Sequence, residues 1–260
     1  MIEDECGAPD FFSGMRMVPV EGPLGRMDLA NLEARIARYP QDAVHHGRAA
    51  AITMTQATEV GTVYTLDEIE AISRTAKAHG LPLHMDGARF ANALSFVGCS
   101  PAEMTWMSGV DVLSFGATKN GALAAEIVVF FQPELAREFE FRRKRAGHLF
   151  SKMRFVSAQL DAYLSDGLWL ANARHANQMA RRLVAGLSTL KGAQLLYPVD
   201  ANEIFVILPP RAHDALQAAG AKYHSWPSDR PGERAYRLVT AFDTDPADVD
   251  RFLSIAKQAA

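Results

Sequence analysis

Two short segments of the chain carry residue types that could do chemistry together. One is 83–89, Leu-His-Met-Asp-Gly-Ala-Arg, and the other is 113–121, Leu-Ser-Phe-Gly-Ala-Thr-Lys-Asn-Gly. Each reads as the end of a buried strand that runs into small and polar residues. The spacing between Asp86 and Lys119 leaves room for one crossover helix between two parallel strands. Because ligands bind at the carboxyl ends of strands in open α/β sheets, both side chains are predicted to face one pocket.

A lysine and a carboxylate on neighbouring strand ends suit pyridoxal phosphate. The lysine amine forms a Schiff base with the aldehyde of this cofactor, and the carboxylate pairs with its pyridinium nitrogen. The protonated ring is then an electron sink for a carbanion at the Cα of an amino acid. Taken singly, each residue has an ordinary interpretation, Lys119 as a solvated loop residue and Asp86 as a helix N-cap. The hypothesis of a cofactor site therefore depends on the pair.

The segments His84 to Arg89 and Ser114 to Gly121 resemble the low-specificity L-threonine aldolases of the β-eliminating-lyase group. The resemblance covers essentially the whole chain in order, with Gly-Ala-Thr-Lys-Asn-Gly around the lysine where many members have Leu-Ser-Lys-Gly. It implies an α/β fold of the pyridoxal-phosphate-dependent transferase type (fold type I). That fold has a mostly parallel central sheet flanked by helices and a small C-terminal α+β domain. Residues 1–165 are then expected to form the C-terminal part of the large cofactor-binding domain, and residues 166–260 the small domain.

The resemblance implies a role for four residues around the cofactor. Lys119 would hold pyridoxal 5'-phosphate, Asp86 would pair with its ring nitrogen, and Thr118 and Arg154 would contact its phosphate. Arg154 follows a basic run at 142–145, which otherwise reads as a solvated helix face.

Three further residues are expected to act on the substrate. Arg89 and Arg237 would bind its carboxylate, since a guanidinium matches a carboxylate with two parallel hydrogen bonds. Arg237 lies in the run Tyr-Arg-Leu-Val-Thr, and its alternative is a surface arginine on a strand. His45, in the run Val-His-His-Gly-Arg, would take the proton of the substrate's β-hydroxyl, because an imidazole titrates near neutral pH. Its alternative is a solvated loop histidine, while His84 is expected to support Asp86 from the same strand face.

The activity implied by the resemblance is cleavage of L-threonine or L-allo-threonine-type β-hydroxy-α-amino acids to glycine and an aldehyde. One alternative is a different pyridoxal phosphate enzyme of the β-eliminating-lyase type. Members of the group are typically longer at the amino end, and their glycine-bearing phosphate loop has no counterpart here. The other alternative is therefore a truncated, non-catalytic remnant that acts as an oligomerisation partner. The group also implies a homodimer or homotetramer.

Composition limits the other possibilities. The chain has 260 residues, 48% of them hydrophobic, which is enough for a large core in one or two domains. A net charge of −3 with mixed signs provides no basic surface for nucleic acid or membrane lipid. No apolar run is long enough to span a bilayer, and Cys6 and Cys99 form neither a disulfide framework nor a metal-ligand spacing. A reduced, cytoplasmic protein whose partner is a small-molecule substrate is expected.

The predicted elements alternate between strands and helices, which favours a parallel sheet with right-handed crossovers. Thr65 to Glu68 has the form of a capping box, and Asp28 that of an N-cap. The wholly apolar run 127–131 is expected to be a central strand covered on both faces. The expected strands are 15–20, 49–55, 81–86, 110–115, 127–131, 204–208 and 236–241, and the main expected helices are 29–39, 66–79, 90–96, 168–190 and the segment from 246 onward.

Overall fold

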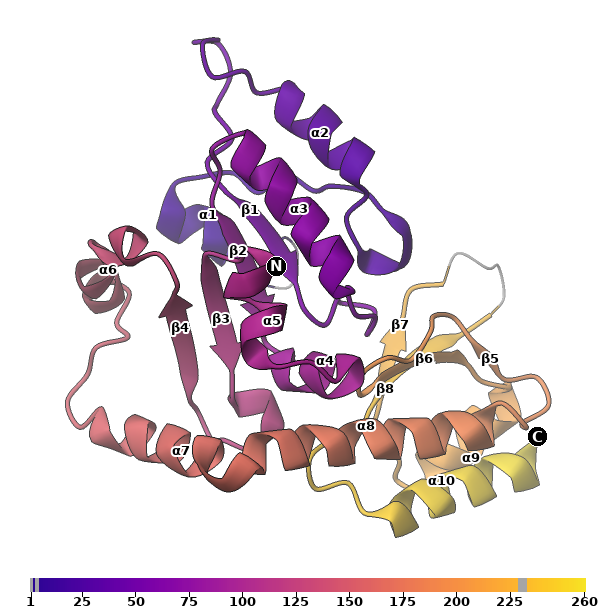
Figure 1. Ribbon diagram of the computed structural model, residues 1–260. Coiled ribbons are helices and arrows are strands. Elements are labelled where there is room, and N and C mark those ends of the chain that lie inside the picture. Colours follow the sequence, from indigo (N-terminus) through magenta and orange to yellow (C-terminus); the bar gives the residue numbers. More distant parts are fainter. Residues whose placement is uncertain (1, 3–4, 229–232) are drawn as a thin grey trace.

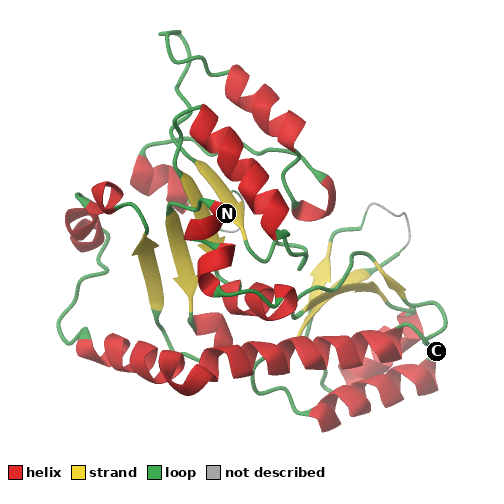
Figure 2. Cartoon of the chain, viewed as in Figure 1, coloured by secondary structure: helices red, strands yellow, loops and turns green. Residues whose placement is uncertain are grey.

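The computed structural model describes residues 2, 5–228 and 233–260. Within these residues the strands form two separate sheets of four strands each (Figure 1). Figure 2 shows the two groups of strands lying apart, with helices around each group and a long helical segment along both. Among the described residues, no helix combines the length and the apolarity needed to cross a lipid bilayer.

The first sheet has the order β1-β2-β3-β4. Strands β1 (Ile52–Thr55), β2 (Leu83–Gly87) and β3 (Val112–Gly116) are parallel, and β4 (Glu126–Phe130) runs antiparallel to β3. The register sets Asp86 beside Ser114 on one side and beside Thr55 on the other. The carboxyl ends of the three parallel strands therefore meet at one edge of the sheet, as predicted.

Two of the strand predictions are wrong. The run 127–131 was expected at the centre of the sheet, but β4 pairs only with β3 among the described residues and its side chains are partly exposed. The connection from β3 to β4 consists of residues 117–125 and is too short for a crossover helix. The chain therefore returns antiparallel beside β3. The run 15–20 is not a strand, although Val20 packs against the first core. An apolar run indicates burial without specifying which strand lies next to it.

Helices cover the first sheet, and their starts follow the local signals. In α3 (Leu66–Ala78) the Thr65 hydroxyl accepts from the Glu68 N–H at 3.2 Å, and the Glu68 carboxylate accepts from the Thr65 N–H at 2.7 Å. The Asp28 carboxylate caps α2 (Leu29–Ala37) by accepting from the Asn31 N–H at 3.0 Å. Both caps confirm the sequence prediction. The other helices of this part are α1 (Ala8–Ser13), α4 (Phe90–Val97), α5 (Pro101–Met104) and α6 (Phe139–Arg145), with short 3₁₀ turns at Pro23–Gly25, Trp106–Ser108, Thr118–Asn120 and Pro133–Ala136.

The second sheet is antiparallel, with the order β5-β6-β8-β7. Its strands are β5 (Gln194–Leu195), β6 (Glu203–Ile207), β7 (His224–Trp226) and β8 (Ala235–Val239). One face packs on α9 (Pro210–Ala218) and α10 (Pro246–Ala259) through a core that includes Ile204, Val206, Tyr236 and Leu238. Because side chains alternate along a strand, Glu203 and Arg237 lie on the opposite face.

Helix α8 (Leu168–Leu187) connects the two parts, following α7 (Arg154–Leu164) and the turn Ser165–Gly167. Its first turn packs on the first core through Trp169 and Leu170, and its later turns pack on the second core through Met179 and Leu183. In Figure 1 it runs along one side of both sheets. The expected class, a mostly parallel sheet flanked by helices with a smaller α+β part, is confirmed. The domain boundary near residue 165 stays a prediction.

Candidate active site

The ends of β2 and β3 bring the segments of Asp86 and Lys119 together. Asp86 lies at the end of β2, and Lys119 lies in the 3₁₀ turn Thr118–Asn120 that follows β3. The two strand ends approach so closely that a Cβ atom on Gly116 would lie 2.6 Å from the Ala88 carbonyl oxygen. A glycine is therefore required here, as in the sequence run that suggested the site. The two predicted cofactor residues belong to adjacent strand ends at one edge of the sheet.

A polar row crosses the sheet face that carries Asp86. His84, two residues earlier on the same face, lies between Thr53 and Ser114, with its Nδ1 2.8 Å from the Thr53 hydroxyl and its Nε2 2.9 Å from the Ser114 hydroxyl. Burial lowers the pKa of His84, and the negative charge of Asp86 opposes that effect. His84 therefore lies on the same strand face as Asp86, as expected, but its ring contacts Thr53 and Ser114, and its support of Asp86 stays a prediction. Thr53 and Ser114 were missed, and only the strand register could have identified them.

The turn that carries Lys119 is held in place by hydrogen bonds of its buried neighbour, Asn120. Asn120 is buried, and its side-chain amide donates to the Tyr163 hydroxyl at 2.6 Å and to the Trp169 carbonyl at 2.8 Å. The side chain of Asn172 in α8 donates to the Asn120 carbonyl at 2.9 Å. Lys119 itself is exposed, and within residues 2, 5–228 and 233–260 its amine has no hydrogen bond or ion pair. The hydrogen bonds of Asn120 thus hold the turn in place, while the amine of Lys119 is exposed.

The two predicted carboxylate-binding arginines meet at a third residue, Glu203. Arg89 lies at the start of α4 and Arg237 in β8, so they come from different parts of the chain. The Oε1 atom of Glu203 is 3.1 Å from Nη2 of Arg89, and it accepts from Nε of Arg237 at 3.0 Å and from Nη2 of the same residue. Glu203 was missed by the sequence analysis, although a charged residue at the start of an apolar strand run was an available signal.

Electrostatics place Asp86 close to this cluster. Burial lowers the pKa of Arg89, the charge of Glu203 raises it, and the positive charge of Arg237 lowers it further. The negative charges of Glu59 and Asp86 also raise the pKa of Arg89, which lies three residues after Asp86. The carboxylate of Asp86 and the two guanidinium groups therefore belong to one region at the edge of the first sheet.

The structure does not bring the remaining predicted residues into contact with this region. His45 is exposed on the loop between α2 and β1, which extends away from the body in Figure 1. Arg154 is exposed at the start of α7, where its guanidinium lies 4.7 Å from the centre of the Phe155 ring. Thr118 is next to Lys119, but its hydroxyl already interacts with the Ala125 backbone.

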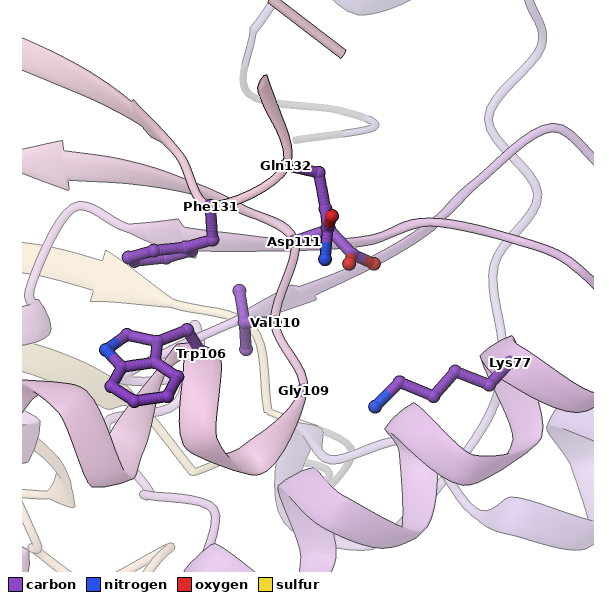
Figure 3. Close-up of a pocket in the computed structure, with 7 residues that line it drawn as sticks. All are labelled: Lys77, Trp106, Gly109, Val110, Asp111, Phe131 and Gln132. Atoms are coloured by element: carbon purple, nitrogen blue, oxygen red, sulfur yellow. The ribbon is translucent and has the colours of Figure 1, made fainter. Parts of the chain in front are cut away.

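A separate pocket of about 340 Å³ lies at the opposite end of the first sheet. Figure 3 shows the Trp106 indole, the Phe131 ring and the Lys77 amine around it. Asp111 precedes β3, so roughly 15 Å of strand separate this pocket from the end of β3. It is therefore not the site of Asp86 and Lys119. The lining residues are Lys77, Trp106, Gly109, Val110, Asp111, Phe131 and Gln132.

The residues at the edge of the sheet fit pyridoxal phosphate at two of its ends. Lys119 offers an unpaired amine to an aldehyde, and Asp86 offers a partly exposed carboxylate whose Oδ1 accepts from the Ala88 N–H at 3.1 Å. A carboxylate accepts several hydrogen bonds, so Asp86 retains capacity for a ring N–H. The buried Nε atom of Arg89 has no hydrogen-bond partner within the described part of the chain and could donate to an anion.

Comparisons with known proteins agree with this chemistry. The family described as beta-eliminating lyase matches residues 1–209. The low specificity L-threonine aldolase of Pseudomonas aeruginosa is 45% identical over 255 residues, which cover 98% of this chain and 71% of that protein. The enzyme of the same name from a Pseudomonas species is 44% identical over 247 residues, covering 95% of this chain and 70% of its own length.

A solved structure confirms the expected fold. The threonine aldolase of Leishmania major superposes with a TM-score of 0.86 at 29% sequence identity. The match covers 94% of this chain and 70% of that chain. The fold is therefore shared over most of this chain.

Proposed function

The chain belongs to the beta-eliminating lyase family, and from this premise we propose that it cleaves L-threonine and L-allo-threonine-type amino acids to glycine and an aldehyde. It is a carbon–carbon lyase that depends on pyridoxal phosphate. The names of its relatives favour this activity over a different β-elimination and over a non-catalytic remnant. The substrate is an amino acid.

The assignment of residues rests on two arginines from different parts of the chain that meet at Glu203, one of them three residues after Asp86. An amino acid that reacts at Cα must have its carboxylate held while the bonds at Cα remain free. Two guanidinium groups next to the strand end that carries a cofactor-binding carboxylate meet this requirement.

When it is bound, pyridoxal phosphate supplies the electron sink that stabilises negative charge at the substrate's Cα. Lys119 would hold the cofactor through its amine, and Asp86 would accept a hydrogen bond from the ring N–H, which favours the protonated ring nitrogen. Arg89 and Arg237 hold the substrate carboxylate and thereby orient its Cα–Cβ bond. Thr118 and Arg154 would bind phosphate oxygens.

His45 takes the proton of the β-hydroxyl, directly or through a water molecule, as the Cα–Cβ bond breaks. This assignment requires the loop of His45 to reach an active site, which is compatible with a site completed by a second copy of the chain. The substitution His45→Gln is expected to lower kcat by about a hundredfold while the visible absorbance of the bound cofactor is unchanged.

Oligomerisation is part of the proposal. Large apolar side chains are exposed at several places, including Phe11, Phe12, Phe155 and Leu123, the last of which lies four residues after Lys119. Such exposure is typical of surfaces that associate. We expect a homodimer or homotetramer in the cytoplasm, to be checked by light scattering of the purified protein and by cell fractionation. A monomer at micromolar concentration would contradict the first expectation.

The test of the activity uses purified protein saturated with pyridoxal phosphate. We expect L-threonine to yield glycine and acetaldehyde in equal amounts, without 2-oxobutanoate or ammonia. The substitution Lys119→Ala should abolish both this activity and the visible absorbance of the bound cofactor, whereas Lys77→Ala, in the pocket at the other end of the sheet, should leave both unchanged. Formation of 2-oxobutanoate and ammonia would indicate β-elimination instead.

A further inference from the structure

A buried carboxylate lies between the two arginines to which we assign the substrate carboxylate. The side chain of Glu203 has no exposed surface, while those of Arg89 and Arg237 are 12% and 21% exposed. One oxygen atom of Glu203, Oε1, contacts both guanidinium groups. Three charged groups, two from the second sheet and one from the start of α4, therefore meet at a single atom.

The polar groups of this cluster are not all satisfied. The Glu203 carboxylate contacts both guanidinium groups, and the negative charges of Glu59 and Asp86 also act on Arg89. The Nε atom of Arg89 is buried and has no hydrogen-bond partner among the described residues. A buried donor without a partner is unfavourable, and a carboxylate from a ligand would supply the missing acceptor.

Glu203 itself has little freedom to move. Its backbone is paired with Val239 of β8, and the loop at Gly61 packs directly against it. A Cβ atom on Gly61 would lie 3.1 Å from both the Cβ and the carbonyl oxygen of Glu203. The arginine side chains are long and flexible, so the fixed carboxylate determines where their guanidinium groups lie.

We propose that Glu203 is a positioning residue that holds Arg89 and Arg237 together so that they receive the α-carboxylate of the substrate. This inference rests on the proposed function, because it takes both arginines as ligands of that carboxylate. Without the negative charge between them, the two guanidinium groups repel each other, and at least one turns away from the site. The substrate carboxylate then meets one guanidinium instead of two.

The test is Glu203→Gln, which keeps the shape of the side chain and removes its charge. We expect KM for L-threonine to rise about tenfold or more, while kcat changes by less than about threefold. The ratio of kcat/KM for L-threonine to that for L-threonine amide should fall about tenfold, because only the acid uses both arginines. A purely structural role would lower the two kcat/KM values together and leave their ratio unchanged.

Two further variants serve as rescue and control. Glu203→Asp keeps the charge but moves it back by one methylene group. Its ratio of kcat/KM for L-threonine to kcat/KM for L-threonine amide should therefore lie between the ratios of the wild type and Glu203→Gln. If Glu203→Gln does not fold, Glu203→Asp alone serves as the test. Glu68→Gln removes the charge of another arginine-paired glutamate, 2.9 Å from Arg26, and keeps a residue compatible with the capping box. The control should leave the ratio unchanged.

A binding measurement separates this inference from the proposed function. Glycine should raise the thermal unfolding midpoint of the wild-type holoprotein more than glycinamide does, and Glu203→Gln should remove that difference. If the wild type prefers glycine and Glu203→Gln loses that preference, but L-threonine is not cleaved, the proposed function fails and the inference stands. An unchanged ratio in Glu203→Gln, or a lower KM for L-threonine, would overturn the inference, since the latter would mean that Glu203 competes with the substrate.

Discussion

His84 lies between two hydroxyl groups, and its imidazole shows how burial acts on a protonation equilibrium in the site. Because burial lowers its pKa from the ordinary value of 6.5, the folded protein binds a proton at His84 less readily than the unfolded chain does. The unfolded state therefore gains stability relative to the folded state as the pH falls below about 6.5. Protonation of His84 at acidic pH should therefore lower the free energy of unfolding.

The substitution His84→Gln should remove this acid sensitivity. The free energy of unfolding of the wild type should decrease between pH 7 and pH 5.5 by more than that of the variant, by up to about 1.4 kcal/mol for each pH unit below 6.5. The two proteins are compared by urea unfolding at each pH, without added cofactor. Parallel curves for wild type and variant would show that His84 makes no contribution to acid sensitivity.

Among the structural elements, the ends of β2 and β3 determine whether a lysine and a carboxylate can share one ring. The backbones approach closely because Gly87 and Gly116 have no side chains. A Cβ atom on Gly116 would meet the Ala88 backbone at 2.6–2.9 Å, where no flexible side chain can move aside. Any residue larger than glycine must push the two strand ends apart.

Gly116→Ala is therefore expected to lower the free energy of unfolding by about 1–3 kcal/mol. It should also lower kcat by about a hundredfold, because a displacement of roughly 1 Å misaligns the reacting groups. Urea unfolding and L-threonine cleavage are the measurements. Gly47→Ala, at a position with open space around it, should leave the unfolding free energy unchanged. A fully active Gly116→Ala variant would contradict the close approach of the strand ends.

Sequence reasoning found these elements because their signals are local. The capping box at Thr65, the N-cap at Asp28 and the alternation of strands and helices all act within a few residues. It placed 127–131 wrongly because strand neighbours are decided by the length of the connecting turn and by tertiary pairing. It missed Glu203 because a single charge in an apolar run has no local counterpart. Its partners are 114 residues before it and 34 residues after it, and only folding brings them together.

At the scale of the whole molecule, the two cores share structure. Helix α8 contributes to both, and the side chains of Asn92 in α4 and Asn177 in α8 are joined by a hydrogen bond of 3.0 Å. Separating the two parts would also leave the buried charge of Glu203 without Arg89, which costs several kcal/mol for a buried ion pair. The two parts should therefore not unfold independently.

This cooperativity can be measured with single-tryptophan variants. One variant keeps only Trp169, which packs on the first core, and another keeps only Trp226, which contacts Phe205 in the second sheet. Their fluorescence should report the same denaturant midpoint as far-UV circular dichroism of the same variant. Two separate transitions would show that the parts are independently stable.

We expect one amine, that of Lys119, to hold the cofactor. This can be measured by reducing the holoprotein with borohydride and locating the pyridoxyl group by mass spectrometry of its peptides. We expect a single modified peptide that contains Lys119, and no modification in Lys119→Ala. A pyridoxyl group on another lysine, or on none, would contradict this expectation.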